Sequence, residues 1–443
     1  MDTLTKVLFR MNVLKNDLSG WLPVAALVFL AALLLAAAVF LLVRFLRKND
    51  GTPDSPFYSL IFFLSRLFQG RSPRLLIEEE ALSGADAPYI LLANHESFFD
   101  FNYLHRMSHP RPPAFLINNY YCTRPVLKTL RRRSGMLSKR LFASDFRAPV
   151  SIMRTLRNGY PVVIFPEGRL SPDGRSNPIV EEGAAFYRRL GVDLVLVRIC
   201  GAYYAGPKWR RRRYHADTTV RVSVERVLKR EEIRSMQDEE LNALIASTLY
   251  NDASLEPPCS YPQKDKAEGL EGLLYRCADC GELYSMHSKG NTLRCRACGS
   301  IHTLDEEYRF TSEPFTIPAW YDHIRETERA ELDSFHLDAA VRTVICPAAG
   351  GSSRKEKGEC SLDAECFSYH SPGIDFSIPT EKLPALAFSC SKEFELYYNN
   401  EQYFFYPLEH PEQSARWALF VDLLSERRRN ERELTCNKRK KRS

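Results

Sequence analysis

The chain has no excess of positive charge outside its last residues, although its formal net charge is +6. Of 61 Lys and Arg and 55 Asp and Glu, nine and two respectively fall within residues 427–443, so the rest of the chain carries 52 basic and 53 acidic side chains. Because a nucleic-acid-binding domain needs a basic face for the phosphates, this distribution disfavours nucleic acid as a partner. The basic segment itself is typical of a solvated, disordered terminus, with attraction to anionic lipid head groups as the alternative.

The sequence also lacks the short motifs of several enzyme classes. It contains no Gly-x-Ser-x-Gly elbow, no Gly-x4-Gly-Lys-Ser/Thr loop and no His-Glu-x-x-His pair, which argues against an α/β-hydrolase, a P-loop nucleotidase and a zinc protease. Four of the 12 cysteines form two Cys-x-x-Cys pairs, and the others are scattered. That usage suits a reducing compartment and a metal site better than a secreted disulfide scaffold.

One long stretch, residues 22–43, has no charged residue. At about 1.5 Å per helical residue it is roughly 33 Å long, which predicts a transmembrane helix within an N-terminal segment of residues 1–50. No small-residue cleavage site follows it, so it is not a signal peptide. Arg44, Arg47 and Lys48 come directly after it, and the positive-inside rule then favours a cytoplasmic C-terminal side. We therefore expect a single-pass protein of the cell membrane with its catalytic domain on the cytoplasmic face.

A second apolar stretch, Phe57–Phe68, is too short to span a bilayer. Its pattern indicates either an amphipathic helix that lies in the membrane interface or a core helix.

With 44% hydrophobic residues over 443 positions, the composition predicts two or three packed domains.

The rest of the chain divides by composition and periodicity. Residues 55–250 alternate short apolar runs (Tyr89–Ala93, Pro161–Phe165 and Leu194–Ile199) with amphipathic helices, which predicts an α/β domain. Residues 251–270 are rich in Pro, Lys and Asp and indicate a linker. A cysteine module at 271–306 follows, and then a β-rich C-terminal domain at 307–426 with a final helix, Ser414–Glu426, and the basic tail at 427–443.

The first candidate catalytic pair lies in Asn94-His95-Glu96-Ser97-Phe98-Phe99-Asp100, directly after an apolar strand. Acyl transfer to an alcohol needs a base that works near neutral pH, and histidine meets that requirement. A carboxylate on the other ring nitrogen fixes the tautomer and stabilises the imidazolium. A turn into a following helix brings Asp100 back to His95. We predict that these two residues form the catalytic dyad.

A second block, Phe165-Pro-Glu-Gly-Arg-Leu-Ser171, also follows an apolar strand. A glycine such as Gly168 lets backbone N–H groups approach an anion, and the guanidinium of Arg169 can grip a phosphate at two oxygens. Arg169 considered alone is equally consistent with an ordinary surface arginine.

The two blocks together resemble the glycerolipid acyltransferase family, whose best-known members are the 1-acylglycerol-3-phosphate (lysophosphatidic acid) acyltransferases. The resemblance covers about Phe57–Leu249 and implies direct attack on an acyl thioester without an acyl-enzyme. It implies His95 as base, Asp100 as its orienting partner, and a substrate-binding block that contains Glu167, Gly168, Arg169 and Ser171. The implied reaction converts 1-acyl-sn-glycerol-3-phosphate to phosphatidic acid in phospholipid biosynthesis, with acyl-CoA or acyl-ACP as co-substrate and with acyl carrier protein and membrane lipids among the partners.

The common form of the second block reads Glu-Gly-Thr-Arg-Ser, whereas Arg169 stands here at the threonine position and Leu170 at the arginine position. Some family members share this form, including ones that act on other lysophospholipids, so another acceptor, for example lysophosphatidylethanolamine, is an alternative. The family's intermediate block, which supplies a basic residue to the phosphate, maps onto residues 135–140. Lys139 and Arg140 are the candidates there.

The two Cys-x-x-Cys-Gly pairs predict a metal site, with Cys277, Cys280, Cys295 and Cys298 as ligands. Each pair can form a knuckle that directs two thiolates at one ion, and four thiolates suit tetrahedral zinc. The module resembles a zinc ribbon, and because no ligand position is open we expect a structural zinc.

The C-terminal domain resembles a pleckstrin-homology-like barrel, in which a curved sheet is closed by one helix that carries a Trp, here Trp417. A membrane-tethered zinc-ribbon adaptor with an inactive acyltransferase domain is therefore the alternative to an enzyme. The retained His95, Asp100, Glu167 and Gly168 favour the enzyme.

Overall fold

The computed structural model describes residues 27–39, 53, 56–68, 74–78, 82, 85–107, 111–120, 134–140, 146–180, 183–210, 218–256 and 260–440. The α/β domain contains these elements: α2 (Pro56–Phe68), β1 (Arg74–Glu78), β2 (Tyr89–Ala93), α3 (Asp100–Leu104), β3 (Ala114–Asn118), β4 (Leu137–Lys139), α6 (Arg147–Arg157), β5 (Val162–Ile164), α7 (Gly183–Leu190), β6 (Asp193–Cys200), α8 (Ala202–Ala205), β7 (Thr219–Leu228), α9 (Arg230–Ser235) and α10 (Asp238–Leu249).

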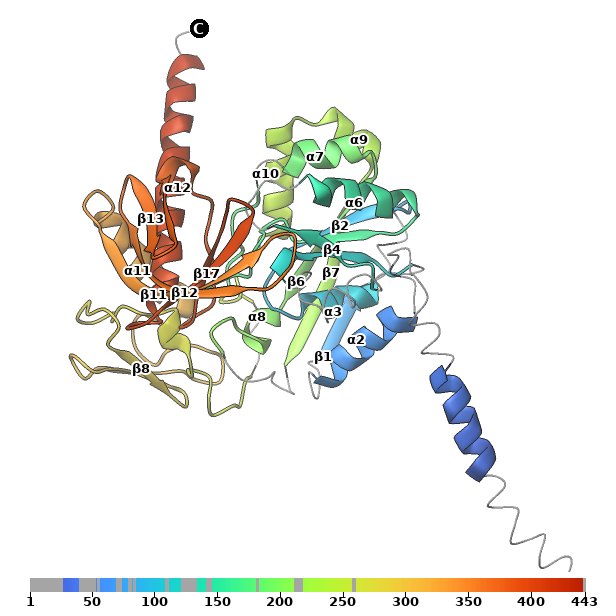
Figure 1. Cartoon of the computed structure of the whole chain (residues 1–443), viewed down its shortest axis with the longest axis horizontal. Coiled ribbons are helices and arrows are strands. Elements are labelled where there is room, and N and C mark those ends of the chain that lie inside the picture. Colours follow the sequence, from blue (N-terminus) through green and yellow to red (C-terminus); the bar gives the residue numbers. More distant parts are fainter. Residues whose placement is uncertain are drawn as a thin grey trace, which may run out of the picture. The chain divides into compact units, whose positions relative to one another are not determined.

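The seven strands of this domain form one mainly parallel sheet in the order β1-β7-β6-β2-β5-β3-β4, in which only the β6–β7 pair is antiparallel. All five residues of the central strand β2 are buried, which explains its continuous apolar sequence. Helices α2 and α3 lie on one face of the sheet, and α6, α7 and α10 lie on the other (Figure 1). Leu91 packs with residues of the first pair of helices and Leu92 with residues of the second group. Because β2 and β5 are parallel neighbours, the loops after them meet at one edge of the sheet.

The cysteine module is a small three-stranded antiparallel sheet in the order β10-β9-β8. Its strands are β8 (Met286–Lys289), β9 (Thr292–Cys295) and β10 (Ile301–Thr303). Helix α11 (Ile317–Ala330) follows it. The side chain of Thr316 caps the start of this helix by accepting a hydrogen bond from the Ala319 N–H, and Pro318 lies in its first turn.

The C-terminal domain is mostly strands, as predicted. It is one antiparallel sheet in the order β14-β13-β12-β11-β17-β16-β15, covered by α12. Trp417 of α12 stacks on Phe394 of the sheet at 4.9 Å between ring centroids. This arrangement is the one that a pleckstrin-homology-like barrel implies, and that likeness stays a prediction. The elements are β11 (Leu337–Pro347), β12 (Arg354–Leu362), β13 (Cys366–Ser371), β14 (Ile374–Pro379), β15 (Ala387–Phe388), β16 (Phe394–Tyr398), β17 (Glu401–Pro407) and α12 (Gln413–Lys440).

Helix α12 is longer than the sequence predicted. It continues through Lys440, so the segment 427–440 is helical and the expectation of a disordered tail is wrong. Arg, Lys and Glu are good helix formers, and the segment contains no Gly or Pro that would stop the helix. Ion pairs from Glu426 to Arg325 and Arg329, and from Arg427 to Asp333, fasten the helix where the tail begins.

One hydrophobic core joins the cysteine module, the C-terminal domain and the end of the α/β domain. It includes Tyr203 of α8, Leu293 of β9 and Trp417 of α12. Tyr261 and Ala267, in the segment predicted as a linker, are buried in the same core. The described residues from 51 to 443 accordingly belong to one compact unit.

Residues 1–50 form the other unit. Within the predicted transmembrane segment 22–43, residues 27–39 are helical, and the flanking residues lie outside the described part of the chain. Among the described residues, no helix is both long and apolar enough to cross a bilayer. The predicted helix at Phe57–Phe68 is α2, in which Tyr58 and Phe62 are buried whereas Leu60, Phe63, Leu64 and Leu67 are exposed.

Candidate active site

His95 and Asp100 meet at the end of β2, as their spacing predicted. Nδ1 of His95 lies 2.9 Å from Oδ2 of Asp100. The same carboxylate oxygen accepts hydrogen bonds from the backbone N–H groups of Glu96 and Ser97, at 2.8 and 3.0 Å. Asp100 is fully buried at the start of α3, and its burial raises the pKa of its carboxyl group, which the donated hydrogen bonds oppose. With Nδ1 held by Asp100, Nε2 is the ring nitrogen that can take a proton.

The loop after β5 holds His95 from the other side. The ring of Phe165 stacks on the imidazole at 4.0 Å between centroids. Oε1 of Glu167 accepts the backbone N–H of His95 at 2.8 Å, and Oε2 accepts the backbone and side-chain N–H groups of Asn177 at 2.7 and 2.9 Å. Burial raises the pKa of Glu167 to about 7, and these hydrogen bonds act in the opposite direction. Glu167 thus binds the loop that carries His95, with both of its oxygens used inside the protein.

Two further residues of the first block tie the end of β2 to the end of β6. The amide of Asn94 pairs with the backbone of Ile199 through two hydrogen bonds of 2.8 and 2.7 Å. Oε2 of Glu96 accepts the N–H groups of Ala202 and Tyr203 at 2.9 and 3.0 Å, at the start of α8. His95 is therefore placed by a loop that is anchored on both neighbouring strands.

Gly168 has a φ of 72°, a left-handed conformation that favours glycine. Next to it, Arg169 does not face open solvent. Its Nη2 lies 2.5 Å from Oδ2 of Asp422 in α12, its Nε donates to Oδ1 of Asn177 at 3.1 Å, and its Nη1 approaches the carbonyl of Leu386 at 3.5 Å. Three of the five guanidinium N–H groups thus have partners within the protein.

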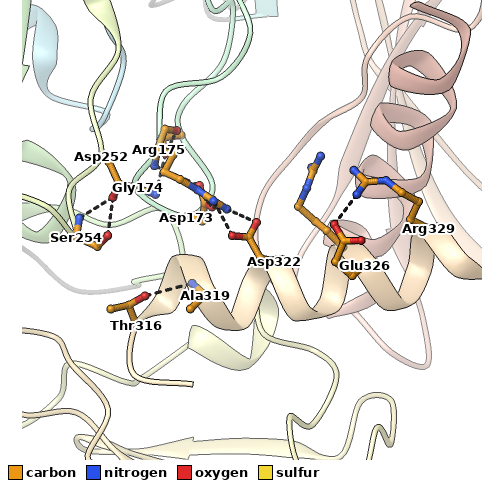
Figure 2. Close-up of polar contacts among 12 residues, drawn as sticks. Asp173, Gly174, Arg175, Asp252, Ser254, Thr316, Ala319, Asp322, Glu326 and Arg329 are labelled. Atoms are coloured by element: carbon orange, nitrogen blue, oxygen red, sulfur yellow. Dashed lines mark hydrogen bonds and ion pairs between the residues drawn. The ribbon is translucent and has the colours of Figure 1, made fainter. Parts of the chain in front are cut away.

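Ser171 and Arg175 complete this loop. Ser171 is buried; its N–H donates to the carbonyl of His95 at 2.9 Å, and its Oγ donates to the carbonyl of Arg175 at 2.7 Å. Arg175 binds Asp173 and makes a two-pronged ion pair with Asp322 of α11, with both N–O distances 2.7 Å (Figure 2). Ser171 therefore shapes the turn, a role that its place in the predicted substrate block did not suggest.

Lys139 and Arg140 lie at the end of β4, and β4 is the third strand from β2 in the sheet. At a strand spacing of about 4.8 Å, roughly 14 Å separates their backbone from the His95 loop. Nη1 of Arg140 donates to Oδ1 of Asn400 in the C-terminal domain at 2.9 Å. The structure does not bring these two residues into direct contact with the dyad.

The four predicted metal ligands converge. The sulfur atoms of Cys277, Cys280, Cys295 and Cys298 all lie within 4.8 Å of one another, and the pairs Cys277–Cys298 and Cys280–Cys295 are each 3.8 Å apart. These distances exclude disulfides. Zinc held by four thiolates at about 2.3 Å has sulfur atoms about 3.8 Å apart, so the cluster fits such an ion. Gly281 and Gly299, with φ of 75° and 79°, turn the chain after each pair.

The segment that contains both motifs has a counterpart among known protein families. Residues 74–197 match the model of the Acyltransferase family, and both motifs lie within the matched segment. Among solved structures, the chain is similar to the crystal structure of the 1-acyl-sn-glycerophosphate (LPA) acyltransferase, PlsC, from Thermotoga maritima. The identity is 21%, the match covers 50% of this chain and 89% of that chain, and the TM-score is 0.39.

Sequence reasoning missed several residues that shape the site. Asn177 and Asn251 are single amides in loops, and nothing in the local pattern distinguishes them. Asp322 and Asp422 lie on helices of another domain, 147 and 253 residues from their arginine partners. Only Asn94 and Glu96 carried a signal, because they flank His95 at the end of a strand.

A buried carboxylate beside the dyad, Glu96, and a partly buried one, Glu256, lead to a pH prediction. Glu96 and Glu256 both accept hydrogen bonds from Nδ2 of Asn251. Burial raises the pKa of Glu256 to about 7, and burial together with the charge of Glu256 raises the pKa of Glu96 well above its ordinary value. The folded protein therefore keeps the Glu256 proton to a higher pH than the unfolded chain does. The contribution of Glu256 to the free energy of unfolding is fully present below about pH 4.5 and is lost as the pH rises through about 7.

Glu256→Gln removes this titration. We expect the loss of unfolding free energy between pH 5 and pH 8 to be smaller in the variant than in the wild type by about 2 kcal/mol. Thermal unfolding in detergent, measured across this pH range, tests the difference. Glu239→Gln on the exposed face of α10 is the control. Equal pH dependence in wild type and Glu256→Gln would contradict the prediction.

Proposed function

We propose that this protein transfers a fatty acyl group from an acyl thioester, acyl-CoA or acyl-ACP, to the free hydroxyl of a lysophospholipid. The observation that carries the proposal is the His95–Asp100 dyad, which lies within the segment that matches the Acyltransferase family and whose loop is anchored to the loop after β5 and to the end of β6. The acceptor indicated by the sequence is 1-acyl-sn-glycerol-3-phosphate, and the product is then phosphatidic acid.

In the proposed mechanism, Nε2 of His95 takes the proton of the acceptor hydroxyl while the oxygen attacks the thioester carbonyl. Asp100 keeps the proton on Nδ1 and stabilises the imidazolium that forms. The tetrahedral intermediate collapses by breaking the C–S bond. The imidazolium then protonates the leaving thiolate, so that His95 returns to its neutral state and an ester and a free thiol are released.

The acceptor head group has a second candidate. Arg169, which the family resemblance assigns to substrate binding, is paired with Asp422. A guanidinium whose charge is already matched attracts a doubly charged phosphomonoester less strongly than a free one does. This observation favours a lysophospholipid with a phosphodiester head group, such as lysophosphatidylethanolamine, as the alternative acceptor. Lys139 and Arg140 remain candidates for the phosphate contact.

We also propose that the enzyme works at the cytoplasmic face of the cell membrane. Support comes from the uncharged stretch at residues 22–43 and from the exposed apolar side chains of α2. Leu60, Phe63, Leu64 and Leu67 follow the i, i+3, i+4, i+7 spacing of one helix face and are 38–64% exposed. Phe98, three residues after His95, is 54% exposed. A lipid substrate that stays in the bilayer would reach His95 past such a surface.

A panel of acceptors and donors tests the proposal. Membranes that carry the full-length protein are incubated with radiolabelled acyl-CoA or acyl-ACP and with lysophospholipids of different head groups. We expect labelled phospholipid to form with at least one acceptor, and the preferred acceptor to be 1-acyl-sn-glycerol-3-phosphate or the phosphodiester alternative. Absence of transfer across the whole panel with both donors would overturn the enzymatic proposal in favour of a membrane-tethered adaptor.

A further inference from the structure

Residues 166–177, in the loop after β5, form ion pairs with α11 and α12, the two long helices of the C-terminal half of the chain. Asp422 of α12 binds Arg169 at 2.5 Å. Asp322 of α11 binds Arg175 through two contacts of 2.7 Å; Figure 2 shows the Asp322 side chain pointing from α11 to Arg175. This loop carries the second sequence motif, so the acyltransferase domain receives two carboxylates from outside the matched segment 74–197.

The first contact continues without interruption to the backbone N–H of His95. From Asp422 it passes to Arg169, whose Nε donates to Oδ1 of Asn177 at 3.1 Å. Asn177 donates its backbone and side-chain N–H groups to Oε2 of Glu167, and Oε1 of Glu167 accepts the N–H of His95 at 2.8 Å. Each member of this chain fixes the orientation of the next.

The second contact continues to the carbonyl oxygen of the same residue. Arg175, held by Asp322, accepts the Ser171 hydroxyl on its carbonyl at 2.7 Å. The N–H of Ser171 then donates to the carbonyl of His95 at 2.9 Å. The backbone of His95 is thus tied at its N–H and at its C=O, and each tie leads to a carboxylate of a helix beyond residue 300.

The two carboxylates differ in burial, and the expected effects differ with it. The side chains of Arg169 and Asp422 are 12% and 17% exposed, so water screens their attraction little and removal of either charge leaves the other buried and unpaired. Asp322 is 50% exposed, and solvent weakens its pair with Arg175. Asp422 therefore constrains the loop more strongly than Asp322.

We propose that Asp422, and more weakly Asp322, are positioning residues for acyl transfer that hold the His95 loop in its working geometry. The C-terminal domain is then a working part of the active site and not only an appended module. This inference rests on the proposed function of His95 as the base. Neither carboxylate touches the reacting atoms; each acts through an arginine of the second motif.

The test compares three variants of the full-length protein in membranes. Asp422→Asn keeps the shape of the side chain and removes its charge, and we expect kcat to fall about tenfold to a hundredfold with little change in KM for either substrate, because a misplaced base slows chemistry and not binding. Asp322→Asn should lower kcat less. Glu426→Gln is the matched control: it lies four residues further along α12 and breaks ion pairs to Arg325 and Arg329 of α11. Its kcat should equal that of the wild type.

A second measurement does not depend on activity. The rate at which diethyl pyrocarbonate modifies His95, followed by mass spectrometry with exposed His336 as internal reference, reports the packing of the loop. We expect the rate to rise at least about threefold in Asp422→Asn and to stay unchanged in Glu426→Gln. Asp422→Glu, which keeps the charge, should restore both kcat and the slow modification in part.

The outcomes are distinguishable. An inactive wild type refutes the proposed function, and the modification rates then decide the positioning role alone. Equal kcat and equal modification rates in wild type, Asp422→Asn and Glu426→Gln overturn the positioning role. A changed KM for a phosphate-bearing acceptor at constant kcat also overturns it, because Arg169 would then contact substrate. If Asp422→Asn does not fold, Asn177→Ala interrupts the same chain inside the α/β domain, and an unchanged kcat in that variant refutes the proposal.

Discussion

Replacing His95 by alanine is expected to abolish acyl transfer, with a loss in kcat of at least about a thousandfold. The imidazole is the one basic group that the dyad geometry provides, and Asp100 cannot replace it because its carboxylate is fully buried and its Oδ2 is occupied by three donors. A neutral hydroxyl left without a base attacks a thioester slowly near pH 7. Initial rates with the preferred acceptor, at saturating donor, measure the loss.

Asp100→Asn tests the orienting partner. An asparagine that keeps its oxygen at the position of Oδ2 still accepts the N–H groups of Glu96 and Ser97 and faces Nδ1 of His95, but it has no charge to stabilise the imidazolium. The loss in kcat should be about a hundredfold to ten-thousandfold. His323→Ala, on the exposed side of α11, is the matched control and should leave kcat unchanged. Retention of wild-type kcat in His95→Ala would rule out His95 as the base.

The sequence predicted the buried centre of the α/β fold and missed its edges. Strands β2, β5 and β6 are buried, and their continuous apolar runs are visible in the sequence. β1, whose residues alternate between exposed and partly buried, and β7, which carries Arg and Glu on its exposed positions, lack a continuous buried apolar run and were not among the strands predicted. The charged start of β12, Arg-Lys-Glu-Lys, likewise does not look like a strand in the sequence, because these residues are mostly exposed. Edge and half-exposed strands form because a neighbouring strand pairs with them. The local periodicity of the sequence does not reveal that neighbour.

The site shows the same division. The His95–Asp100 contact is local and follows from a turn into α3, so spacing predicted it. The partner of Arg169 is a single aspartate on a helix 253 residues away, and a lone Asp in an amphipathic helix carries no signal. The role of Glu167 could not be predicted either. A glutamate that contacts substrate and one that binds two backbone N–H groups look the same in the sequence. The four cysteines were predictable, because their chemistry and spacing are sufficient.

The double substitution Cys277→Ser with Cys280→Ser is expected to remove a structural zinc and to unfold the cysteine module. We expect about one zinc per chain in the wild type and none in the variant, measured by inductively coupled plasma mass spectrometry. Cys277 and Cys295 are buried in a module whose own sheet has only three short strands. So small a sheet cannot form an adequate core by itself, and the metal would supply much of its folding free energy.

The damage should extend beyond the module. Arg276, next to Cys277, forms a buried ion pair with Glu328 of α11, and its carbonyl accepts the indole N–H of Trp320 at 2.9 Å. Glu328 also binds Arg416 of α12. Loss of the knuckle at Cys277 therefore leaves Glu328 with one fewer partner in a buried place and loosens α11 and α12 together. We expect new protease cleavage sites between residues 271 and 330, together with a lower melting temperature of the whole unit.

Cys366→Ser, a change at a partly buried cysteine of β13 outside the cluster, is the matched control and should keep both the zinc and the melting temperature. A wild-type protein purified without chelator that contains no zinc would refute the metal site. A variant that loses zinc but keeps its protease resistance would show that the hydrophobic core shared with Tyr203 and Trp417 is enough to fold the module.

Because that core is continuous with the helices that carry Asp322 and Asp422, loss of zinc should also lower acyl transfer in the folded fraction, by the same route as Asp422→Asn.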